Sequence, residues 1–377
     1  MKAVDRLESM LDALEARHRR RDLIPARGLD FASNDYLGLA GSNLLKDAAQ
    51  AALARGVPVG SGGSRLLRGN HPEHEALEQE AAAFFGSEAA LFMGGGFQAN
   101  QAIFSALPAA GDLVLYDALV HASAHEGMRA SRADLRAFRH NDVEDARKAL
   151  TEWRATGGAG HIWIAVESVY SMEGDLAPLE DLASLARDTD AVLIVDEAHA
   201  TGVFGLNGKG LAHDLSADLL TLHTCGKGLG VAGGVICGPR VMIDTLINRA
   251  RPFIFATAPS PLNAALVRAT LQELAANDRL VAAARERVGH AHHVARQTGL
   301  PDSALTSQIV PVILGDEART MATASALQQQ GFDIRGIRPP TVPKGTSRLR
   351  VSITGNVTHE DISALFATIA SYQSEAA

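Results

Sequence analysis

The chain has 377 residues, enough for two or three domains that each bury a core of their own. Its 35 basic and 43 acidic residues give a formal charge of −8, so no global positive field exists to attract nucleic acid or an anionic membrane. No apolar run approaches the length of a membrane span, and the two cysteines, Cys225 and Cys237, cannot form a disulfide framework. These features predict a globular protein of the cytoplasm.

An amphipathic helix is predicted at the N-terminus, which lacks the apolar core of a signal peptide. Four apolar residues share one helical face: Val4, Leu7, Leu11 and Leu14. Arg17 and the arginines at 19–21 follow, and we expect them to close this helix with positive charge. The helix is expected to pack on the body of the protein or on a partner subunit, and the arginines alternatively to face an acidic ligand.

The next segments predict two helices joined by a loop. Residues 34–38 have the composition of a turn, and helical patterns cover 44–55 and 73–85. Between the two helices, residues 60–65 are rich in glycine and serine and have no periodic apolar pattern, which indicates a loop.

Short apolar strands then alternate with helical segments, which is typical of an α/β domain. The strand candidates are residues 89–93, 113–116, 162–166, 192–195 and 234–237, and the helices include 143–151 and 179–187. Most of these strands are continuously apolar, which predicts burial on both faces of a mainly parallel sheet.

The pattern changes after the Pro-Ser-Pro segment at 259–261. A long helical pattern over 262–297 leads to strands near 309–314 and 349–353, which indicates a smaller α+β domain. We therefore expect an N-terminal arm and helix over residues 1–43, a large domain over 44–270 and a small C-terminal domain over 271–377.

Candidate chemistry lies after the strands, because open α/β sheets bind ligands at the carboxyl ends of their strands. Asp196 directly follows the strand at 192–195, and His199 lies three residues further on. Lys227 stands between two glycines, so another group can approach its amine closely.

An anion site is predicted at residues 94–97, where three glycines and Phe97 follow a strand and open a helix. Each of these segments has an ordinary structural reading by itself: a helix cap, an exposed lysine or a plain turn. Together they offer an anion cradle, an amine and a carboxylate, and pyridoxal phosphate requires all three.

Two motif matches lack the context that their chemistry needs. Residues 196–199 spell the Asp-Glu-Ala-His of helicases, but the chain is acidic and contains no phosphate-binding loop. Gly228, Gly230 and Gly233 match a dinucleotide fingerprint, but a strand-like segment follows them instead of a helix.

Metal binding has weak support. His121 and His125, with Glu126, have the spacing of neighbours on a helix, and His71 and His74 form a second pair. Spacing places no third ligand beside either pair, and we predict no metal site.

As a set, these segments resemble the α-oxoamine synthase family of fold-type I pyridoxal-phosphate enzymes. The resemblance runs from around Phe31 to Thr354 and is carried by residues 34–38, 60–64, 195–202, 224–228, 337–343 and 348–350. It implies an aminotransferase-like large domain with a mainly parallel seven-stranded sheet between helices, plus a smaller α+β C-terminal domain.

The resemblance also implies a role for each candidate residue toward pyridoxal 5′-phosphate. Lys227 binds the cofactor covalently, Asp196 pairs with its ring nitrogen, and His121 stacks on the ring. His199 and Ser171 bond the phenolic oxygen. Three residues meet the phosphate: Thr224 and, through their backbones, Gly96 and Phe97.

The substrate-binding residues implied in the same way are His121, Arg338, Thr341 and Arg350. Because a buried carboxylate without a partner is strongly disfavoured, we also expect a cation at the carboxylate end of the acyl chain, and Arg19, just after the predicted helix, is the first candidate. The segment 337–343 most resembles members that condense L-alanine with a pimeloyl thioester and release carbon dioxide. The thioester arrives on coenzyme A or on an acyl carrier protein, and the implied assembly is a homodimer with sites at the subunit interface.

Three other functions stay open from the sequence. A sibling synthase uses glycine or serine with another thioester, an aminotransferase shares the fold without needing a thioester, and a non-enzymatic protein binds an acyl carrier. When alanine reacts with the thioester, release of a free thiol and of carbon dioxide separates the alanine-using synthase from the aminotransferase and from the carrier-binding protein.

Overall fold

The computed structural model describes residues 2–17 and 19–374. Unit 2 combines Asn34–Ser171 with Leu176–Arg285, and unit 1 consists of Met1–Ser33, Met172–Asp175 and Glu286–Ala377. The two compact units meet in the sequence after Ser33 and after Arg285. The domain boundaries expected after residues 43 and 270 stay a prediction.

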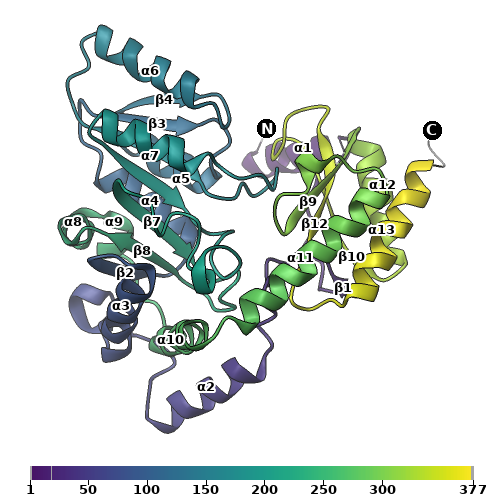
Figure 1. The fold of residues 1–377 in the computed structure, drawn as a ribbon, viewed down its shortest axis with the longest axis horizontal. Coiled ribbons are helices and arrows are strands. Elements are labelled where there is room, and N and C mark those ends of the chain that lie inside the picture. Colours follow the sequence, from purple (N-terminus) through teal and green to yellow (C-terminus); the bar gives the residue numbers. More distant parts are fainter. Residues whose placement is uncertain (1, 18, 375–377) are drawn as a thin grey trace. The chain divides into compact units, whose positions relative to one another are not determined.

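Unit 2 is built on a seven-stranded sheet in the order β2-β8-β7-β6-β5-β3-β4 (Figure 1). The strands are β2 (Ala89–Met93), β3 (Leu113–Asp117), β4 (Asp134–Phe138), β5 (Ile162–Glu167), β6 (Ala191–Asp196), β7 (Asp218–Thr224) and β8 (Gly234–Gly238). The pairs from β7 through β4 are parallel, and β8 is antiparallel to both of its neighbours. The predicted fold class, a mainly parallel seven-stranded sheet between helices, is confirmed.

Two of the seven strands lie outside the predicted set, and each is polar for a physical reason. β4 is an edge strand, and most of its residues face solvent. β7 carries Thr221 and His223 on a buried face, where the histidine ring stacks on Phe85 with 3.5 Å between ring centroids. Hydroxyl groups of Thr201 and Thr221 bond the two ring nitrogens, each at 2.9 Å. Burial lowers the pKa of His223 to about 3, so the ring is neutral in the core.

Both faces of the sheet are covered by helices, as the alternation of side chains along a strand requires. On one face, residues such as Ile194 and Leu222 pack against α4 (Gly96–Ala106), α5 (Ala122–Arg129), α8 (Arg240–Arg249) and α9 (Arg251–Ile254). On the other face, Val195 packs under α6 (Val143–Ala155) and α7 (Leu179–Asp188), and Val235 packs under α3 (Pro72–Phe85) and α10 (Pro261–Ala276). Full burial of each such side chain contributes about 1.5–3 kcal/mol.

Helix ends follow recognisable capping residues. Ser42 caps α2 (Asn43–Ala54) by accepting from the amide of Leu45, and Ser260 caps α10 with Pro261 in its first turn. The prediction of one continuous helical segment over 262–297 is wrong. The segment forms two helices, α10 and α11 (Arg279–Gln297), because Asn277 takes an extended conformation after the last turn of α10.

Unit 1 holds a three-stranded antiparallel sheet in the order β11-β12-β9. Its strands are β9 (Ile309–Gly315), β11 (Arg335–Ile337) and β12 (Ser347–Ser352), and a parallel pair joins β1 (Leu29–Asp30) to β10 (Phe332–Asp333). The core of the unit, including Leu349, Val351 and Phe366, packs this sheet against α11, α12 (Glu317–Gln329) and α13 (His359–Ser374). Among the described residues, no helix combines the length and the apolar character needed to cross a bilayer.

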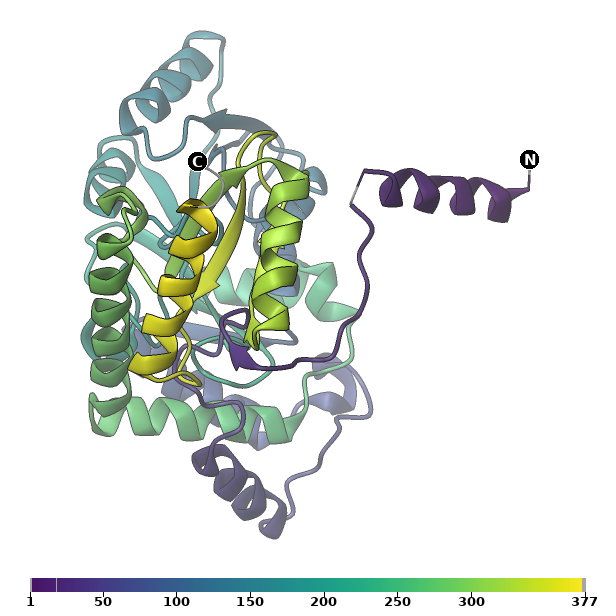
Figure 2. The ribbon, with the colours of Figure 1, turned by 90° about the vertical axis from the view of Figure 1, so that its right-hand side faces the viewer.

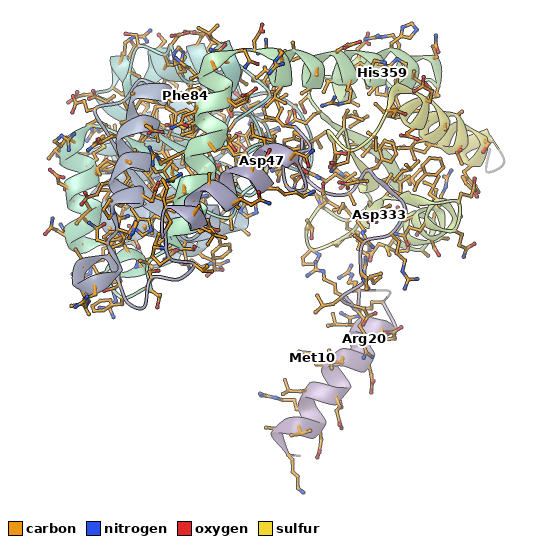
Figure 3. The ribbon with its side chains drawn as sticks, turned by 90° about the horizontal axis from the view of Figure 1, so that it is seen from below. Met10, Arg20, Asp47, Phe84, Asp333 and His359 are labelled. Atoms are coloured by element: carbon orange, nitrogen blue, oxygen red, sulfur yellow. The ribbon has the colours of Figure 1, made fainter. Side chains whose placement is uncertain are left out.

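The predicted N-terminal helix exists as α1 (Ala3–Glu15), but the arginines do not close it. The helix ends before Arg17, its last turn contains no basic residue, and residues 19–27 have no regular secondary structure. None of its residues is buried, and Figure 2 shows it standing clear of the sheet in unit 1. Met10, labelled in Figure 3, is 52% exposed, and Val4 is 62% exposed. The apolar face of α1 thus lies open in the single chain.

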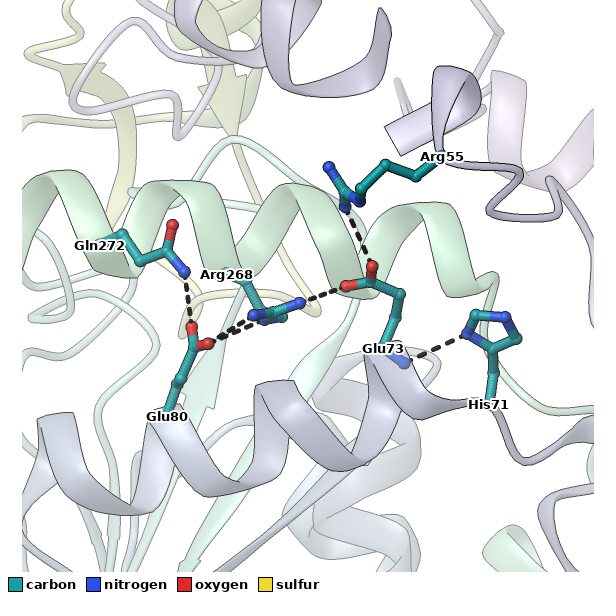
Figure 4. Close-up of polar contacts among 6 residues, drawn as sticks. All are labelled: Arg55, His71, Glu73, Glu80, Arg268 and Gln272. Carbon is teal, nitrogen blue, oxygen red and sulfur yellow. Dashed lines mark hydrogen bonds and ion pairs between the residues drawn. The ribbon is translucent and has the colours of Figure 1, made fainter. Parts of the chain in front are cut away.

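An ion-pair network ties α2, α3 and α10 together (Figure 4). Arg268 of α10 bridges two carboxylates of α3, pairing with Glu73 and, at 2.6 Å, with Glu80. Arg55, at the end of α2, reaches the other oxygen of Glu73 at 3.0 Å, and Gln272 donates to Glu80 at 3.0 Å. Burial raises the pKa of Glu73, but the hydrogen bonds from both arginines outweigh it and hold the pKa below its ordinary value of 4.5.

We predict that Arg268→Met lowers the free energy of unfolding by about 1–3 kcal/mol, because charge-assisted hydrogen bonds are lost while the aliphatic stem remains. The pKa of Glu73 is lower in the folded chain, so its contribution is complete above pH 4.5 and disappears as the pH falls through the lowered value. The difference between parent and variant should therefore shrink in acid. Urea unfolding at several pH values measures it.

The matched control is Arg279→Met, because Arg279 is 79% exposed and pairs with Glu273 at 3.1 Å. An exposed pair of this kind contributes less than about 1 kcal/mol. Equal losses in both variants, or a difference for Arg268 that does not change with pH, would contradict the role given to the network.

Candidate active site

The candidate site forms where the carboxyl ends of parallel strands meet at one edge of the sheet in unit 2. β7 ends at Thr224, β6 at Asp196, β5 at Glu167 and β3 at Asp117. The pairing of β5 with β6 sets Glu167 directly beside Asp196, and Asp196 lies opposite Leu222 in β7. Segments far apart in the chain therefore deliver their polar ends to one place.

Lys227 lies in a chain of hydrogen bonds that starts in the turn at residues 34–38. Its Nζ is 2.7 Å from Nε2 of His199, whose Nδ1 is 2.6 Å from the hydroxyl of Tyr36. Tyr36 donates its own hydrogen to Oδ1 of Asn34 at 2.9 Å, so its oxygen accepts from Nδ1 of His199. This order leaves Nε2 as the acceptor that faces the lysine amine.

The turn that carries Lys227 connects β7 to β8 and packs tightly. The amide of Cys225 donates to the carbonyl of Gly233, and the cysteine side chain is fully buried. A Cβ at Gly228 would lie 2.3 Å from the carbonyl oxygen of Thr201. The glycine beside the lysine is thus required by the close approach of two backbones. The strand that follows, β8, confirms that the dinucleotide-like glycines do not open a helix.

Asp196 has its carboxylate held by two N–H donors. Nδ2 of Asn100 donates to Oδ2 at 2.8 Å, and the amide of Ala198 donates to Oδ1 at 2.9 Å. Both bonds orient the carboxylate. The second hydrogen of the Asn100 amide goes to Oγ of Ser123 at 2.9 Å.

His121 is the N-cap of α5 and lies beside Asp196 and Lys227. Its Nδ1 accepts from the amide of Ser123 at 3.2 Å and contacts Oγ of Ser123 at 2.8 Å, so Nε2 carries the proton of the neutral ring. The residue is open to solvent on one side, but desolvation by the surrounding protein lowers its pKa. Asp196 opposes this shift, and the charges of Lys227 and His125 add to it. Asn100, His121 and Asp196 also line one small cavity.

The predicted anion cradle lies at the start of α4. Gly95 is the N-cap, and the amides of the first turn point out of the helix without intrahelical acceptors. A Cβ at Gly96 would lie 2.2 Å from Oγ1 of Thr224, so the helix start and this hydroxyl meet where no side chain fits. Phe97 is 50% exposed beside them. The helix dipole and the free amides favour an anion here.

Ser171 is the last residue before the chain leaves unit 2. Its amide donates to Oε2 of Glu167 at 3.3 Å, which fixes it just beyond β5. Its bond to a phenolic oxygen stays a prediction.

The four remaining predicted residues lie in unit 1. Arg19 forms a two-bond ion pair with Glu317, and Arg338 donates to the carbonyl of Arg20 at 2.9 Å. Thr341 accepts from Arg21 at 3.3 Å. Arg350 is buried in β12, where it donates to Ser352 at 2.7 Å.

Three residues at the site were missing from the prediction: Tyr36, Asn100 and Ser123. Asn100 follows Gly96 by one helical turn, so the helix predicted there already set it on the same face. Ser123 follows His121 by two residues, the usual spacing of a residue that bonds an N-cap. Tyr36 had no local signal, because its partner His199 is distant in the chain.

The histidines weighed for metal binding have other partners. His125 packs edge-on against Tyr116, His71 accepts from the amide of Glu73, and His74 bonds the carbonyl of Pro259 at 2.8 Å. Within residues 2–17 and 19–374, no three histidine, cysteine or carboxylate side chains gather at a possible metal site.

The residues present fit pyridoxal phosphate. The cradle that a Cβ at Gly96 would fill suits a phosphate, and the carboxylate of Asp196 suits a protonated ring nitrogen. The amine of Lys227 faces a histidine acceptor at the same edge of the sheet. An amine, a carboxylate and an anion cradle thus come from three different strand ends.

Comparison with known proteins agrees with this geometry. The model of the aminotransferase class I and II family matches residues 26–369. The 8-amino-7-oxononanoate synthase of Anaeromyxobacter dehalogenans strain 2CP-1 is 41% identical over 373 residues, covering 93% of this chain and 91% of that protein. The enzyme of the same name from Acidithiobacillus ferrooxidans strain ATCC 53993 is 40% identical, covering 90% and 87%.

Solved structures show the same fold. Serine palmitoyltransferase from S. paucimobilis superposes with a TM-score of 0.88 at 26% identity, covering 100% of this chain and 99% of that one. The 8-amino-7-oxononanoate synthase from Francisella tularensis gives a TM-score of 0.76 at 27% identity, covering 92% and 98%. The chain therefore belongs to the aminotransferase class I and II family and, within it, to the family of the 8-amino-7-oxononanoate synthases.

Proposed function

We propose that the protein condenses L-alanine with a pimeloyl thioester, with loss of carbon dioxide, to give 8-amino-7-oxononanoate in biotin biosynthesis. The cofactor is pyridoxal 5′-phosphate, which supplies an electron sink for the pair left on the alanine Cα when it loses its proton. The single observation that carries the proposal is the meeting of Lys227, His199, Asp196 and the start of α4 at one sheet edge. The relatives named 8-amino-7-oxononanoate synthase supply the reaction.

Lys227 is proposed as the residue that binds the cofactor and, once alanine has replaced it, removes the alanine Cα proton. His199 lies 2.7 Å away and offers Nε2 as an acceptor, so it can share a proton with the freed amine. Asp196, whose two carboxylate oxygens are oriented by N–H donors, is proposed to keep a proton on the ring nitrogen. His121 presents a neutral ring with an open side, which suits stacking on the flat cofactor.

The phosphate end is proposed to lie against Thr224 and the backbones of Gly96 and Phe97. The first-turn amides of α4 would donate to an anion there. Ser171, beyond β5, is proposed to bond the phenolic oxygen together with His199.

The carboxylates of the substrates are proposed to meet arginines of unit 1. Arg350 and Arg338 are the candidates for the alanine carboxylate, and a guanidinium fork would fix the bond that breaks. Thr341 and Arg19 are the candidates for the acyl chain. We also propose a homodimer in the cytoplasm. An acyl carrier protein is a possible donor of the thioester.

A second candidate is a sibling synthase that uses serine or glycine. The specific observation in its favour is the closer superposition on serine palmitoyltransferase, at a TM-score of 0.88 against 0.76. Sequence identity favours the first reading, at 41% against 26%.

We predict that borohydride treatment of the holoenzyme fixes one cofactor mass on the peptide that contains Lys227. The glycines beside this lysine and the acceptor at 2.7 Å leave its amine accessible and oriented. Peptide mass analysis reads the position of the label. Lys209→Arg is the control, because this lysine lies near His213 instead and should leave the labelling unchanged. A label on any other lysine would overturn the assignment.

Asp196→Asn should keep the fold and slow the removal of the alanine Cα proton by about 100-fold, because losing one partner of a buried ion pair costs about 3 kcal/mol. The measurement is exchange of that hydrogen in deuterated water, followed by NMR without any thioester. Asp218→Asn, at the exposed start of β7, is the matched control with no expected effect. Exchange at the parental rate in Asp196→Asn would show that this carboxylate does not hold the ring proton.

Alanine should be preferred over glycine and serine by at least about tenfold in kcat/KM, which is the lower end of what one methyl group contributes in a fitted pocket. Thiol release from pimeloyl-CoA with each amino acid provides the measurement. Carbon dioxide should appear in equal amount, which an aminotransferase would not produce. Higher turnover with serine or glycine would move the assignment to a sibling synthase.

A further inference from the structure

Three arginines, Arg19, Arg21 and Arg338, lie close together in unit 1, and we call them the arginine cluster. Arg19 pairs with Glu317, in the C-terminal part of the unit. Arg20 lies 3.7 Å from Glu15, whereas Arg21 reaches Oγ1 of Thr341. Arg338 donates from Nη2 to the backbone carbonyl of Arg20.

One carboxylate lies in this cluster. Glu317, the first residue of α12, receives two parallel bonds from Arg19, Nε to Oε2 at 3.0 Å and Nη2 to Oε1 at 2.7 Å. Both side chains remain partly accessible, with 27% and 22% of their areas exposed. The geometry is the fork that a guanidinium makes with any carboxylate, including one on a ligand.

The positive charge of the cluster exceeds its negative charge. Within the described residues, neither Arg21 nor Arg338 forms an ion pair with a carboxylate, and Nε of Arg338 is buried without a hydrogen-bond partner. Burial lowers the pKa of Arg338, and the nearby charges of Arg21 and Arg19 lower it further, against the opposing effect of Glu317. Nη1 of Arg338 contacts the sulfur of Met321 at 3.1 Å. A cluster with spare positive charge is suited to a second carboxylate.

We infer that Glu317 is an internal carboxylate that competes with the terminal carboxylate of the acyl substrate for Arg19 and thereby sets the selectivity of the arginine cluster. The inference deepens the proposed function, because it rests on that proposal for the identity of the acyl chain. Glu317 acts here as a specificity-determining residue and takes no part in the reaction itself. A donor without a terminal charge has nothing to gain from displacing it.

The direction of the effect follows from charge. Replacing Glu317 with glutamine keeps the shape of the side chain, frees the fork of Arg19 and removes one negative charge from the cluster. A dicarboxylate should then bind about two- to fivefold more tightly, the range that partly exposed ion pairs span. Because charges near solvent are screened, the gain should decline as salt is added.

The test compares Glu317→Gln with the parent in two measurements on the holoenzyme. Titration calorimetry with pimelate itself should show the tighter binding, at low salt more than at high salt. In the assay, the KM for pimeloyl-CoA should fall by a similar factor at unchanged kcat, while the KM for its terminal methyl ester stays within about twofold. Arg19→Ala added to Glu317→Gln should abolish the gain.

Glu15→Gln is the matched control. It removes the same charge from a glutamate that pairs with the neighbouring Arg20 instead of with Arg19. It should change neither measurement, and an equal gain in this variant would reduce the effect to general electrostatics.

Other outcomes overturn the inference. Unchanged pimelate binding in Glu317→Gln would show that no competition exists. Weaker binding would show that Glu317 holds Arg19 in place for the ligand. Weaker use of both thioesters, with a lower unfolding temperature, would assign it a structural role. If the parent does not turn over pimeloyl-CoA at all, the proposed function fails, and pimelate calorimetry still decides the inference about Glu317.

Discussion

Parallel pairing of β6 with β5 and β7 is the constraint on which the rest of unit 2 depends. It sets Asp196 level with Glu167 on one side and with Leu222 on the other, so the strand ends share one edge. Because side chains alternate along a strand, a slip of one residue would turn Asp196 toward the opposite face. The apolar residues on both faces therefore fix the position of a carboxylate that contributes nothing to the core. The same packing holds α4 against the sheet and sets Gly96 beside Thr224.

Hydrogen bonds then orient the polar groups at this edge. Two N–H donors bond the carboxylate oxygens of Asp196, and the amide of Ser123 makes Nδ1 of His121 an acceptor. The hydroxyl of Tyr36 has its hydrogen committed to Asn34, which leaves His199 one orientation of its proton. The tautomers of the two histidines are thus decided by hydrogen bonds to their neighbours. Unit 1 follows a different principle, since its arginines lie close together with less than a full set of counter-charges.

The sequence predicted the parts of this arrangement that depend on local pattern. Continuous apolar runs located β2, β3, β5, β6 and β8, and glycines marked the turn around Lys227 and the start of α4. β7 lacked that pattern, because His223 is buried with partners for both nitrogens that only the fold brings together. The break between α10 and α11 depends on the backbone of Asn277, which helical periodicity does not register. Arg19 was expected at the carboxylate of the acyl substrate, and sequence pattern gave no sign of its pairing with Glu317, which lies 298 positions away in the chain.

The burial of Cys225 has a consequence for an enzyme that handles thioesters. A thiolate exchanges readily with a thioester and adds to an aldehyde, and Cys225 lies only two residues before the lysine that is proposed to bind the cofactor. Its side chain is fully enclosed between the sheet and the helices above it, and burial raises the pKa of the thiol well above its ordinary range. The sulfur therefore stays protonated and out of reach, so the lysine amine faces no nucleophilic rival from its own turn. The protein can keep a small, dense side chain at that point of the core without diverting acyl groups onto itself.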